Sequence, residues 1–299
     1  MITVIGSINL DLIATVERIP QGGETVPGHE FKTSPGGKGA NQALAAARAG
    51  AQVRMVGAVG KDSFAADALE LLKQAGIDLS SVRETHAATG IASIMVADDG
   101  ENVIAVVPGA NGTVLPGDVK NAQLAKGQIV LLQHEIPLES VEAALNAARE
   151  AGAISILNTA PARKDATALI SQADYVVANE TEFDIYADAL SLKGADRKAR
   201  MAAFTASTGR IVVVTLGGEG VLASTPDGLF SVAALPITPV DTVGAGDTFC
   251  GYLAAGLAAG KGLEDALTFA AAAGSLACLK PGAQPAIPLA KDVEDALKA

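Results

Sequence analysis

The sequence predicts an α/β fold with a mainly parallel, doubly wound sheet and a small additional β-sheet. Several short apolar runs, of which IVVVTL at residues 211–216 is the clearest, lack the alternation of a half-buried strand. Such runs are typical of parallel sheets that are buried on both faces. They alternate with segments of helical spacing, the order expected of βαβ units. Two alternating runs on either side of residue 100 indicate the small sheet.

The elements of the main sheet follow in order along the chain. We predict strands where β-branched and other apolar residues cluster before a glycine or polar turn. We predict helices where apolar residues recur at helical spacing and a glycine, such as Gly50 or Gly76, ends the segment. The predicted strands are residues 1–5, 53–59, 129–133, 154–157, 175–178, 211–216 and 221–223. The predicted helices are residues 41–49, 63–74, 138–150, 164–171, 247–259 and 263–279.

The region around residue 100 interrupts this order. Residues 89–107 form two alternating runs joined by Asp98-Asp99-Gly100, which is a hairpin signal. Because hairpins do not belong to a doubly wound core, we expect a β lid beside it, formed by about residues 10–35 and 88–108. The chain has no internal repeat and no low-complexity linker, so we expect residues 1–299 to form a single domain.

Composition excludes several classes of protein. Hydrophobic residues make up 49% and charged residues 18% of the 299 residues, which excludes a disordered chain. A net charge of −11 and only 3% aromatic residues argue against nucleic acid as a partner. We expect no membrane association, since no apolar run reaches ~18 residues and no signal peptide is recognisable. Cys250 and Cys278 lie in apolar sequence, and we expect free thiols in a cytoplasmic protein.

The strongest motif is Asp241-Thr-Val-Gly-Ala-Gly-Asp247-Thr-Phe, which opens the 247–259 helix. The N–H groups of Gly244, Ala245 and Gly246 would lie at the helix N-terminus, where unpaired donors and the helix dipole favour an anion. A carboxylate there, that of Asp247, suits a base that takes a proton from a hydroxyl attacking a phosphate. The alternative is an ordinary helix cap, since Asp is a favoured capping residue.

Two turns in the first half of the chain carry polar residues. Residues 36–42, GGKGANQ, place Lys38 and Asn41 on a glycine-rich turn into a helix. This suits a ligand with several hydroxyls, although Asn41 could cap the helix and Lys38 could be solvated. Asn9 and Asp11 share one face of an extended segment after the first strand. Ligands of α/β sheets bind at that end of the strands; a plain turn is the alternative.

Further motifs lie in the second half. Asn179 and Glu182 could order the water shell of Mg²⁺, form a capping box, or do both. The glycine-rich segment 215–220 precedes a predicted strand, so it indicates a nucleotide-contacting loop rather than a dinucleotide fingerprint. The rigid loop 280–285 could offer backbone carbonyls to a cation or only connect two elements. The His and Cys residues lack zinc-site spacing.

Taken in this order, the motifs resemble the ribokinase family of ATP-dependent sugar kinases. The similarity runs from GSINLD at residues 6–11 to KPGAQPAIP at residues 280–288. GGKGANQ and DTVGAGDTF are similar to the two signatures of the family. The resemblance implies a three-layer α/β/α core with a β-sheet lid and a homodimer through the lids. It also implies transfer of the γ-phosphoryl group of ATP to a primary hydroxyl of a sugar, with D-ribose as the leading substrate.

The resemblance further implies roles by position. Asp247 would be the catalytic base, and the backbone of Gly244, Ala245 and Gly246 would be the anion hole for the moving phosphoryl group. The implied sugar ligands are Asn9, Asp11, Gly37, Lys38, Asn41, Glu135 and Asp247. The implied nucleotide contacts are Asn179, Thr215, Gly217, Gly220 and Gly246, and Glu182 would hold Mg²⁺ or another divalent cation through water. K⁺ is implied as an activator in a loop of Asp241, Val243, Ala277, Lys280, Gly282 and Ala286.

Three alternatives stay open. A related kinase would act on another sugar, a sugar acid or a nucleoside. A catalytically silent regulator would bind sugar or nucleotide on the same fold, although Asp247 and the Gly-Ala-Gly turn argue against it. A dinucleotide-dependent oxidoreductase would need a helix after Gly220. The chain also departs from the pattern usual in the family at Ala271, Cys250 and Tyr252.

Overall fold

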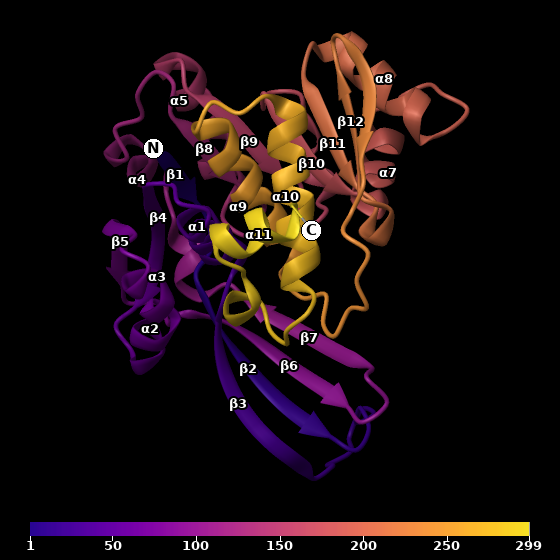
Figure 1. Ribbon diagram of the computed structural model, residues 1–299. Coiled ribbons are helices and arrows are strands. Elements are labelled where there is room, and N and C mark those ends of the chain that lie inside the picture. Colours follow the sequence, from indigo (N-terminus) through magenta and orange to yellow (C-terminus); the bar gives the residue numbers. More distant parts are fainter. Residues whose placement is uncertain (299) are drawn as a thin grey trace.

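A nine-stranded sheet forms the centre of the molecule, as the computed structural model of residues 1–298 shows (Figure 1). Its strands are β1 (Ile2–Ile5), β4 (Val53–Gly60), β5 (Asp78–Thr85), β8 (Ile129–Leu132), β9 (Ile154–Asn158), β10 (Tyr175–Asn179), β11 (Ile211–Thr215), β12 (Val221–Thr225) and β13 (Gly228–Val232). Their order is β13-β12-β11-β10-β9-β8-β1-β4-β5. All neighbours from β11 to β5 are parallel, and only β12 and β13 are antiparallel to their neighbours.

Helices cover both faces of this sheet. One face carries α1 (Lys38–Arg48), α2 (Ser63–Ala68), α3 (Glu70–Gln74), α9 (Ala245–Ala258), α10 (Leu263–Ala277) and α11 (Ala290–Ala296). The other carries α4 (Pro116–Asn121), α5 (Leu138–Ala151), α6 (Thr167–Ile170), α7 (Glu180–Ala189) and α8 (Arg197–Thr208). Short 3₁₀ turns are η1 (Gly109–Thr113), η2 (Lys164–Ala166), η3 (Gly217–Glu219) and η4 (Gln284–Ala286). This three-layer α/β/α arrangement confirms the predicted fold class.

The side chains of β1 show why its sequence does not alternate. Ile2 and Val4 belong to the apolar cluster beneath the first group of helices, whereas Ile5 belongs to the cluster beneath the second. Successive side chains of a strand point to opposite faces. A strand covered on both faces therefore needs apolar residues at every position, and this is what the continuous runs in the sequence encode.

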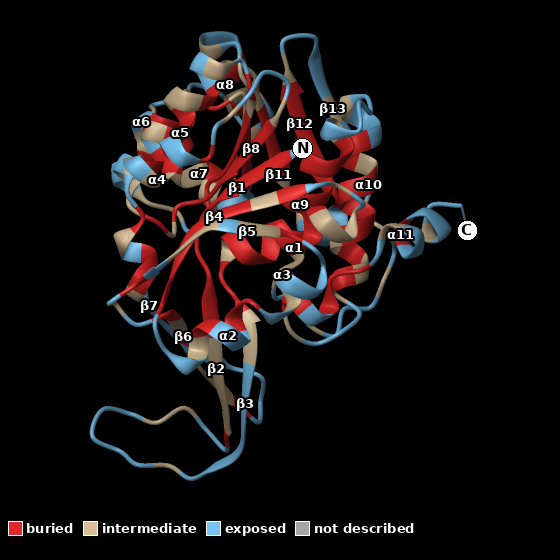
Figure 2. Cartoon of the chain, turned by 90° about the vertical axis from the view of Figure 1, so that its left-hand side faces the viewer, coloured by how far each residue is buried: buried red, intermediate tan, exposed pale blue. Residues whose placement is uncertain are grey.

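A second, four-stranded sheet stands apart from the core. Its strands are β2 (Asn9–Val16), β3 (Gly28–Gly36), β6 (Gly90–Ala97) and β7 (Asn102–Val107), in the order β3-β2-β6-β7. The strands β6 and β7 form the expected hairpin, in which the Ala97 N–H donates to the Glu101 carbonyl at 2.8 Å. The small sheet projects away from the buried core, and β7 is exposed along its whole length (Figure 2).

Some element boundaries differ from those predicted. The helices α1 and α9 begin at Lys38 and Ala245, earlier than expected, because Gly37 and Gly244 are their N-caps. The predicted helix 63–74 is interrupted at Leu69, where two backbone hydrogen bonds still bridge α2 and α3. The predicted helix 164–171 is a 3₁₀ turn followed by the four-residue α6.

The structure of the segment after Gly220 tests the alternative of a dinucleotide-dependent oxidoreductase. It forms β12, which pairs antiparallel with β11 in a hairpin. A dinucleotide fingerprint needs a helix at this place, so the oxidoreductase alternative is wrong. No helix within residues 1–298 combines the length and apolarity needed to cross a membrane.

Candidate active site

The candidate residues gather where several parallel strands end and two helices begin. Strands β1, β8, β9, β10 and β11 are neighbours in the sheet, so their carboxyl ends lie along one edge. The helices α1 and α9 pack against each other over this sheet. Ligands of open α/β sheets bind beyond the carboxyl ends of the strands. The fold therefore brings motifs from both halves of the chain to one place.

Asp247 lies in the first turn of α9 and is 6% exposed. Asn41 donates to its Oδ2 from Nδ2 at 2.9 Å, and Gln42 donates to its Oδ1 from Nε2 at 2.9 Å. The same Gln42 Nε2 lies 3.1 Å from Asn158 Oδ1, and Gln42 Oε1 accepts from Gln133 Nε2 at 2.6 Å. A chain of buried amides therefore fixes the carboxylate in position.

The turn before Asp247 presents unpaired backbone donors. Gly244 is in the left-handed region at φ 76°, and its Cβ position would lie 2.8 Å from Ala283 Cα. The N–H groups of Gly244, Gly246 and Asp247 donate to no atom of residues 1–298, whereas Ala245 N–H donates to the Thr242 carbonyl at 3.3 Å. Free donors at a helix N-terminus form an anion site, so the turn has the expected donors except at Ala245.

A cavity of about 230 Å³ opens in front of these donors. Lys38, Asp247 and Cys250 are among the residues that line it. The Lys38 ammonium forms no ion pair within the described chain, and the charge of Asp247 raises its pKa. Burial raises the pKa of the Cys250 thiol well above its usual value, so the thiol is neutral. The cavity thus combines a carboxylate, a cation and backbone donors.

Asn9 and Asp11 lie on the small sheet, and Glu135 is bonded to the backbone of Lys38, which lines the cavity. Asn9 and Asp11 are two residues apart on β2 and so share a face. Glu135 Oε2 accepts from the Ser7 hydroxyl at 2.6 Å and from the Lys38 N–H at 3.1 Å. Burial, assisted by the charges of Glu135 and Asp247, raises the pKa of Asp11 to about 7. Three carboxylates therefore face one polar region, which suits a ligand that brings several hydroxyl donors.

A second cavity of about 300 Å³ adjoins the first. The two share Thr215, Thr242 and Gly246, so they form one continuous cleft. Gly217 and Gly220 lie on its wall, and its other lining is largely apolar, with Phe249 and Ala271 among it. An apolar slot that leads to an anion site suits a nucleotide, which has a flat base at one end and charged phosphates at the other.

Asn179 and Glu182 join β10 to α7 and line the first cavity. The Asn179 side chain accepts from Glu182 N–H at 2.8 Å, and Glu182 Oε2 accepts from Asn179 N–H at 3.0 Å. This is the capping box that the sequence offered as an alternative. Glu182 Oε1 accepts no hydrogen bond within residues 1–298, so one oxygen stays available to water around a divalent cation. No described group of three or more His, Cys, Asp or Glu side chains could hold a metal by itself.

The proposed cation loop consists of two segments that Asp241 holds together. Its side chain accepts from Val243 N–H at 3.0 Å and from Gly282 N–H at 2.8 Å. Within residues 1–298, no backbone N–H donates to the carbonyls of Ala277, Lys280, Gly282 or Ala286. For Ala277 the reason is local: the residue four positions on is Pro281, which has no N–H. Free carbonyls are suitable ligands for a monovalent cation, so the residues fit the expected site.

Several residues of the site had no role in the sequence analysis. Gln42 belongs to a recognised motif, but its contacts to Gln133 and Asn158 depend on the fold. Asn111 is 1% exposed and donates to Asn9 Oδ1. A polar residue that is buried in the fold is a signal of function, but the sequence does not reveal which polar residues are buried.

Comparisons with known proteins agree with this geometry. Residues 1–290 match the family described as pfkB family carbohydrate kinase. A ribokinase of Bacillus subtilis (strain 168) is 42% identical over 299 residues, which cover 99% of each chain. The crystal structure of a ribokinase from Thermotoga maritima has a TM-score of 0.92 at 32% identity, covering 100% of this chain and 99% of the other.

One solved structure adds ligands to the comparison. An Arabidopsis thaliana ribokinase complexed with ribose and ATP has a TM-score of 0.88 at 32% identity, covering 100% of this chain and 98% of that chain. The family match extends over nearly the whole chain, and it includes every residue assigned above to the carboxylate, the anion site and the cleft. The chain therefore belongs to the pfkB family of carbohydrate kinases.

Proposed function

We propose that this protein transfers the γ-phosphoryl group of ATP to the primary hydroxyl of D-ribose, giving D-ribose 5-phosphate. The observation that carries the proposal is the position of Asp247 beside free N–H groups at the start of α9. A hydroxyl next to this carboxylate would lose its proton as it attacks a phosphate held by those groups. The names of the relatives support ribose as the acceptor.

The cleft and the neighbouring polar region support two ligands, ATP and a sugar, held end to end. We assign the apolar cavity with Gly217 and Gly220 to the base of ATP, and Thr215 and Asn179 to the path of its phosphates. The amides of Gly244 and Gly246 would stabilise the charge on the moving phosphoryl group, and Lys38 lines the same cavity. We assign the sugar to the polar region with ligands Asn9, Asp11, Gly37, Lys38, Asn41 and Glu135.

Two cations belong to the proposal. Glu182 would hold the water shell of Mg²⁺, which neutralises charge on the phosphates when it is bound. The loop of Asp241, Val243, Ala277, Lys280, Gly282 and Ala286 would hold K⁺ through its carbonyls. Because Gly244 packs against Ala283 of this loop, an ordered loop would keep the amides of the anion site in place.

We further propose that the small sheet acts as a lid and as the interface of a homodimer. Closure over the sugar would exclude water as a competing acceptor. On the face of the sheet that carries Asp11, Ile104 and Val106 of β7 are each 52% exposed, and exposed apolar side chains of this kind are what partner subunits cover. We place the protein in the cytoplasm, where its two free cysteines would stay reduced.

The test measures ADP formed from MgATP with D-ribose, 2-deoxyribose, fructose, a sugar acid and a nucleoside, with and without K⁺. We expect ribose-dependent turnover that K⁺ raises. Asp247→Asn should lower kcat roughly 10²- to 10⁴-fold. This variant should fold, because Asn41 Oδ1 is buried and has no partner among residues 1–298. A flip of the Asn41 amide lets it accept from the new side chain.

Each other outcome has a separate meaning. Turnover with another acceptor would keep the mechanism and replace ribose. Binding of sugar or ATP without turnover would indicate a silent regulator and overturn the proposal. Full activity of Asp247→Asn would show that this carboxylate is not the base.

A further inference from the structure

Asn111, on η1, links the two segments that lead into and out of the small sheet. Its Oδ1 accepts from the Ile8 N–H at 2.8 Å, and its Nδ2 donates to the Ile8 carbonyl at 3.1 Å. The same Nδ2 donates to Asn9 Oδ1 at 2.7 Å. Asn9 begins β2 and Ile8 directly precedes it, whereas Asn111 follows the end of β7. All three side chains are at most 4% exposed.

These contacts determine which way the Asn9 amide faces. Amide oxygen and nitrogen atoms are assigned from their hydrogen-bond partners, and a backbone N–H can only donate. Because Ile8 N–H needs an acceptor, Asn111 must turn its oxygen toward it, and its nitrogen is then the atom next to Asn9. The Asn9 oxygen is thereby occupied. Asn9 Nδ2 donates to no atom of residues 1–298 and is the polar atom left for a ligand.

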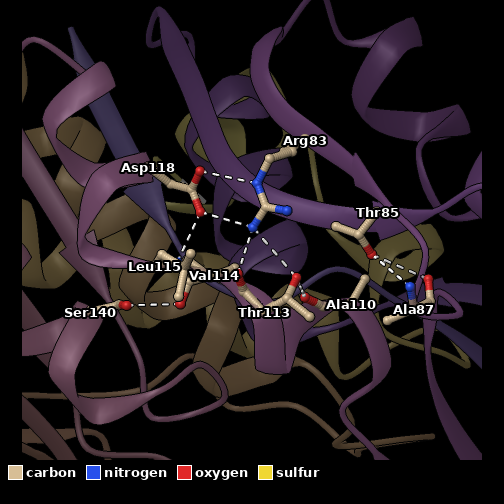
Figure 3. A network of polar contacts seen from close by, with 9 residues as sticks. All are labelled: Arg83, Thr85, Ala87, Ala110, Thr113, Val114, Leu115, Asp118 and Ser140. Atoms are coloured by element: carbon tan, nitrogen blue, oxygen red, sulfur yellow. Dashed lines mark hydrogen bonds and ion pairs between the residues drawn. The ribbon is translucent and has the colours of Figure 1, made fainter.

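The surroundings of Asn111 leave these two amides little freedom. Gly90, the first residue of β6, lies against both of them, and a Cβ there would collide with Asn111 Nδ2 and Asn9 Oδ1. Asn111 itself sits on an anchored segment, shown in Figure 3. Arg83 pairs with Asp118 through two nitrogens at 3.1 Å and also donates to the Thr113 carbonyl.

The same segment is anchored at a second point. The Ser140 hydroxyl on α5 donates to the Val114 carbonyl at 2.8 Å, and Leu115 N–H donates to Asp118 Oδ2 at 2.9 Å (Figure 3). An element held by buried and charge-assisted bonds keeps the side chain it carries in one geometry. The segment that carries Asn111 is therefore held by the core.

We infer that Asn111 is a positioning residue that makes Asn9 a hydrogen-bond donor toward a hydroxyl oxygen of the sugar. Asp11, two residues on and on the same face of β2, is the matching acceptor when it is ionised. The first strand of the small sheet thus presents a fixed donor-then-acceptor order, which sets the direction of the hydrogen bonds that neighbouring hydroxyls make. The inference rests on the sugar position given under the proposed function.

The main test is a double-mutant cycle between Asn111→Asp and Asn9→Ala. An ionised Asp at position 111 still accepts from Ile8 N–H but can donate neither to the Ile8 carbonyl nor to Asn9. Asn9 should therefore turn its nitrogen toward the carboxylate and its oxygen toward the sugar. We expect the KM for sugar to rise roughly 10- to 100-fold, with kcat and the KM for ATP within about twofold. In the Asn9→Ala background the same change should alter the KM for sugar by less than about threefold. Asn121→Asp, an exposed change on α4, is the control.

A second variant leaves Asn111 untouched. Asn9→Asp keeps an oxygen that accepts from Asn111 but presents oxygen instead of nitrogen to the sugar, so sugar binding measured by calorimetry should weaken to a similar extent. If Asn111→Asp raises the KM for sugar equally with and without the Asn9 side chain, Asn111 only holds the backbone. If Asn9→Asp binds sugar as tightly as the unmodified protein, the assignment of Asn9 as a donor is wrong. If the unmodified protein shows no sugar-dependent turnover of ATP, the proposed function is wrong. If it shows such turnover and the variants have the same KM and affinity for sugar, only the inference about Asn111 is wrong.

Discussion

Asn41 Nδ2 lies 2.9 Å from Asp247 Oδ2 although the two residues are 206 positions apart in the sequence. The contact joins the N-terminal turns of α1 and α9. It places a motif of the first half of the chain against a motif of the second half. The geometry of the carboxylate therefore depends on how these two helices pack, and not on the DTVGAGDTF motif alone.

Removal of the central amide should show how much stability the buried chain contributes. Gln42→Ala leaves Gln133 Nε2, Asn158 Oδ1 and Asp247 Oδ1 each without the partner that Gln42 supplied. A buried polar group without a partner costs about 1–3 kcal/mol, so we expect the free energy of unfolding in urea to fall by roughly 2–4 kcal/mol. The exposed Gln74→Ala on α3 should change it by less than about 0.5 kcal/mol. Equal effects of the two changes would contradict the buried network.

The pH dependence of sugar binding should follow Asp11. Burial and two neighbouring carboxylates raise its pKa to about 7, and the ionised form is the one that accepts hydroxyl protons. We expect the KM for sugar to fall as the pH rises from 6 to 8 and this trend to vanish in Asp11→Asn. A KM that falls equally in both proteins would assign the trend to another group.

The same raised pKa has an effect on stability, with a defined sign. Between about pH 4 and pH 7 the folded state holds a proton on Asp11 that the unfolded state has released, so this group lowers stability as the pH rises through that window. Without sugar, the Tm of Asp11→Asn should therefore exceed that of the unmodified protein by a margin that grows from pH 4 to pH 7 and then stays constant. Thermal melts at pH 4.5, 6 and 8 measure this margin.

Two glycines of one turn should respond differently to alanine. At Gly246 no atom of the described residues, apart from its chain neighbours, lies within 4 Å of the Cβ position. Gly246→Ala should therefore fold normally while placing a methyl group in the cavity proposed to bind the phosphates. We expect kcat/KM for ATP to fall at least about tenfold with no decrease in Tm. At Gly244 a Cβ would meet Ala283 and the backbone is left-handed, so Gly244→Ala should cost roughly 1–3 kcal/mol of stability. A lower Tm for Gly246→Ala than for the unmodified protein would show that the space beside Gly246 is needed for stability.

The association state should depend on the exposed side of β7. Ile104 is 52% exposed, and a lysine there would place a charge in an apolar interface. We expect sedimentation velocity to show a dimer for the unmodified protein and a monomer for Ile104→Lys. Leu289→Lys, at a side chain that is 56% exposed before α11, should stay dimeric. A dimer that survives Ile104→Lys would place the interface elsewhere.

The sequence predicted those parts of the fold and site that local patterns encode. Strands such as β11 are continuous apolar runs, and Lys38 and Asp247 stand beside glycine turns at helix starts. The edge strands β5 and β13 were not predicted, because edge strands carry polar and exposed residues that obscure the pattern. Asn111 is an isolated polar residue whose partner Ile8 is 103 positions away, so only the folded chain reveals its contact.

The central position of β1 has a consequence for the order in which the chain becomes structured during synthesis. Its two neighbours, β4 and β8, are both made later, and β8 follows all four strands of the small sheet. The helix α9, which supplies the carboxylate to Asn41 and Gln42, is made later still. Pairings between distant segments form slowly and leave apolar surface open meanwhile. A nascent chain that stops before α9 would therefore expose the apolar face of α1 and lack the Asp247 carboxylate, so interrupted products would be recognisable to chaperones and proteases as unfinished.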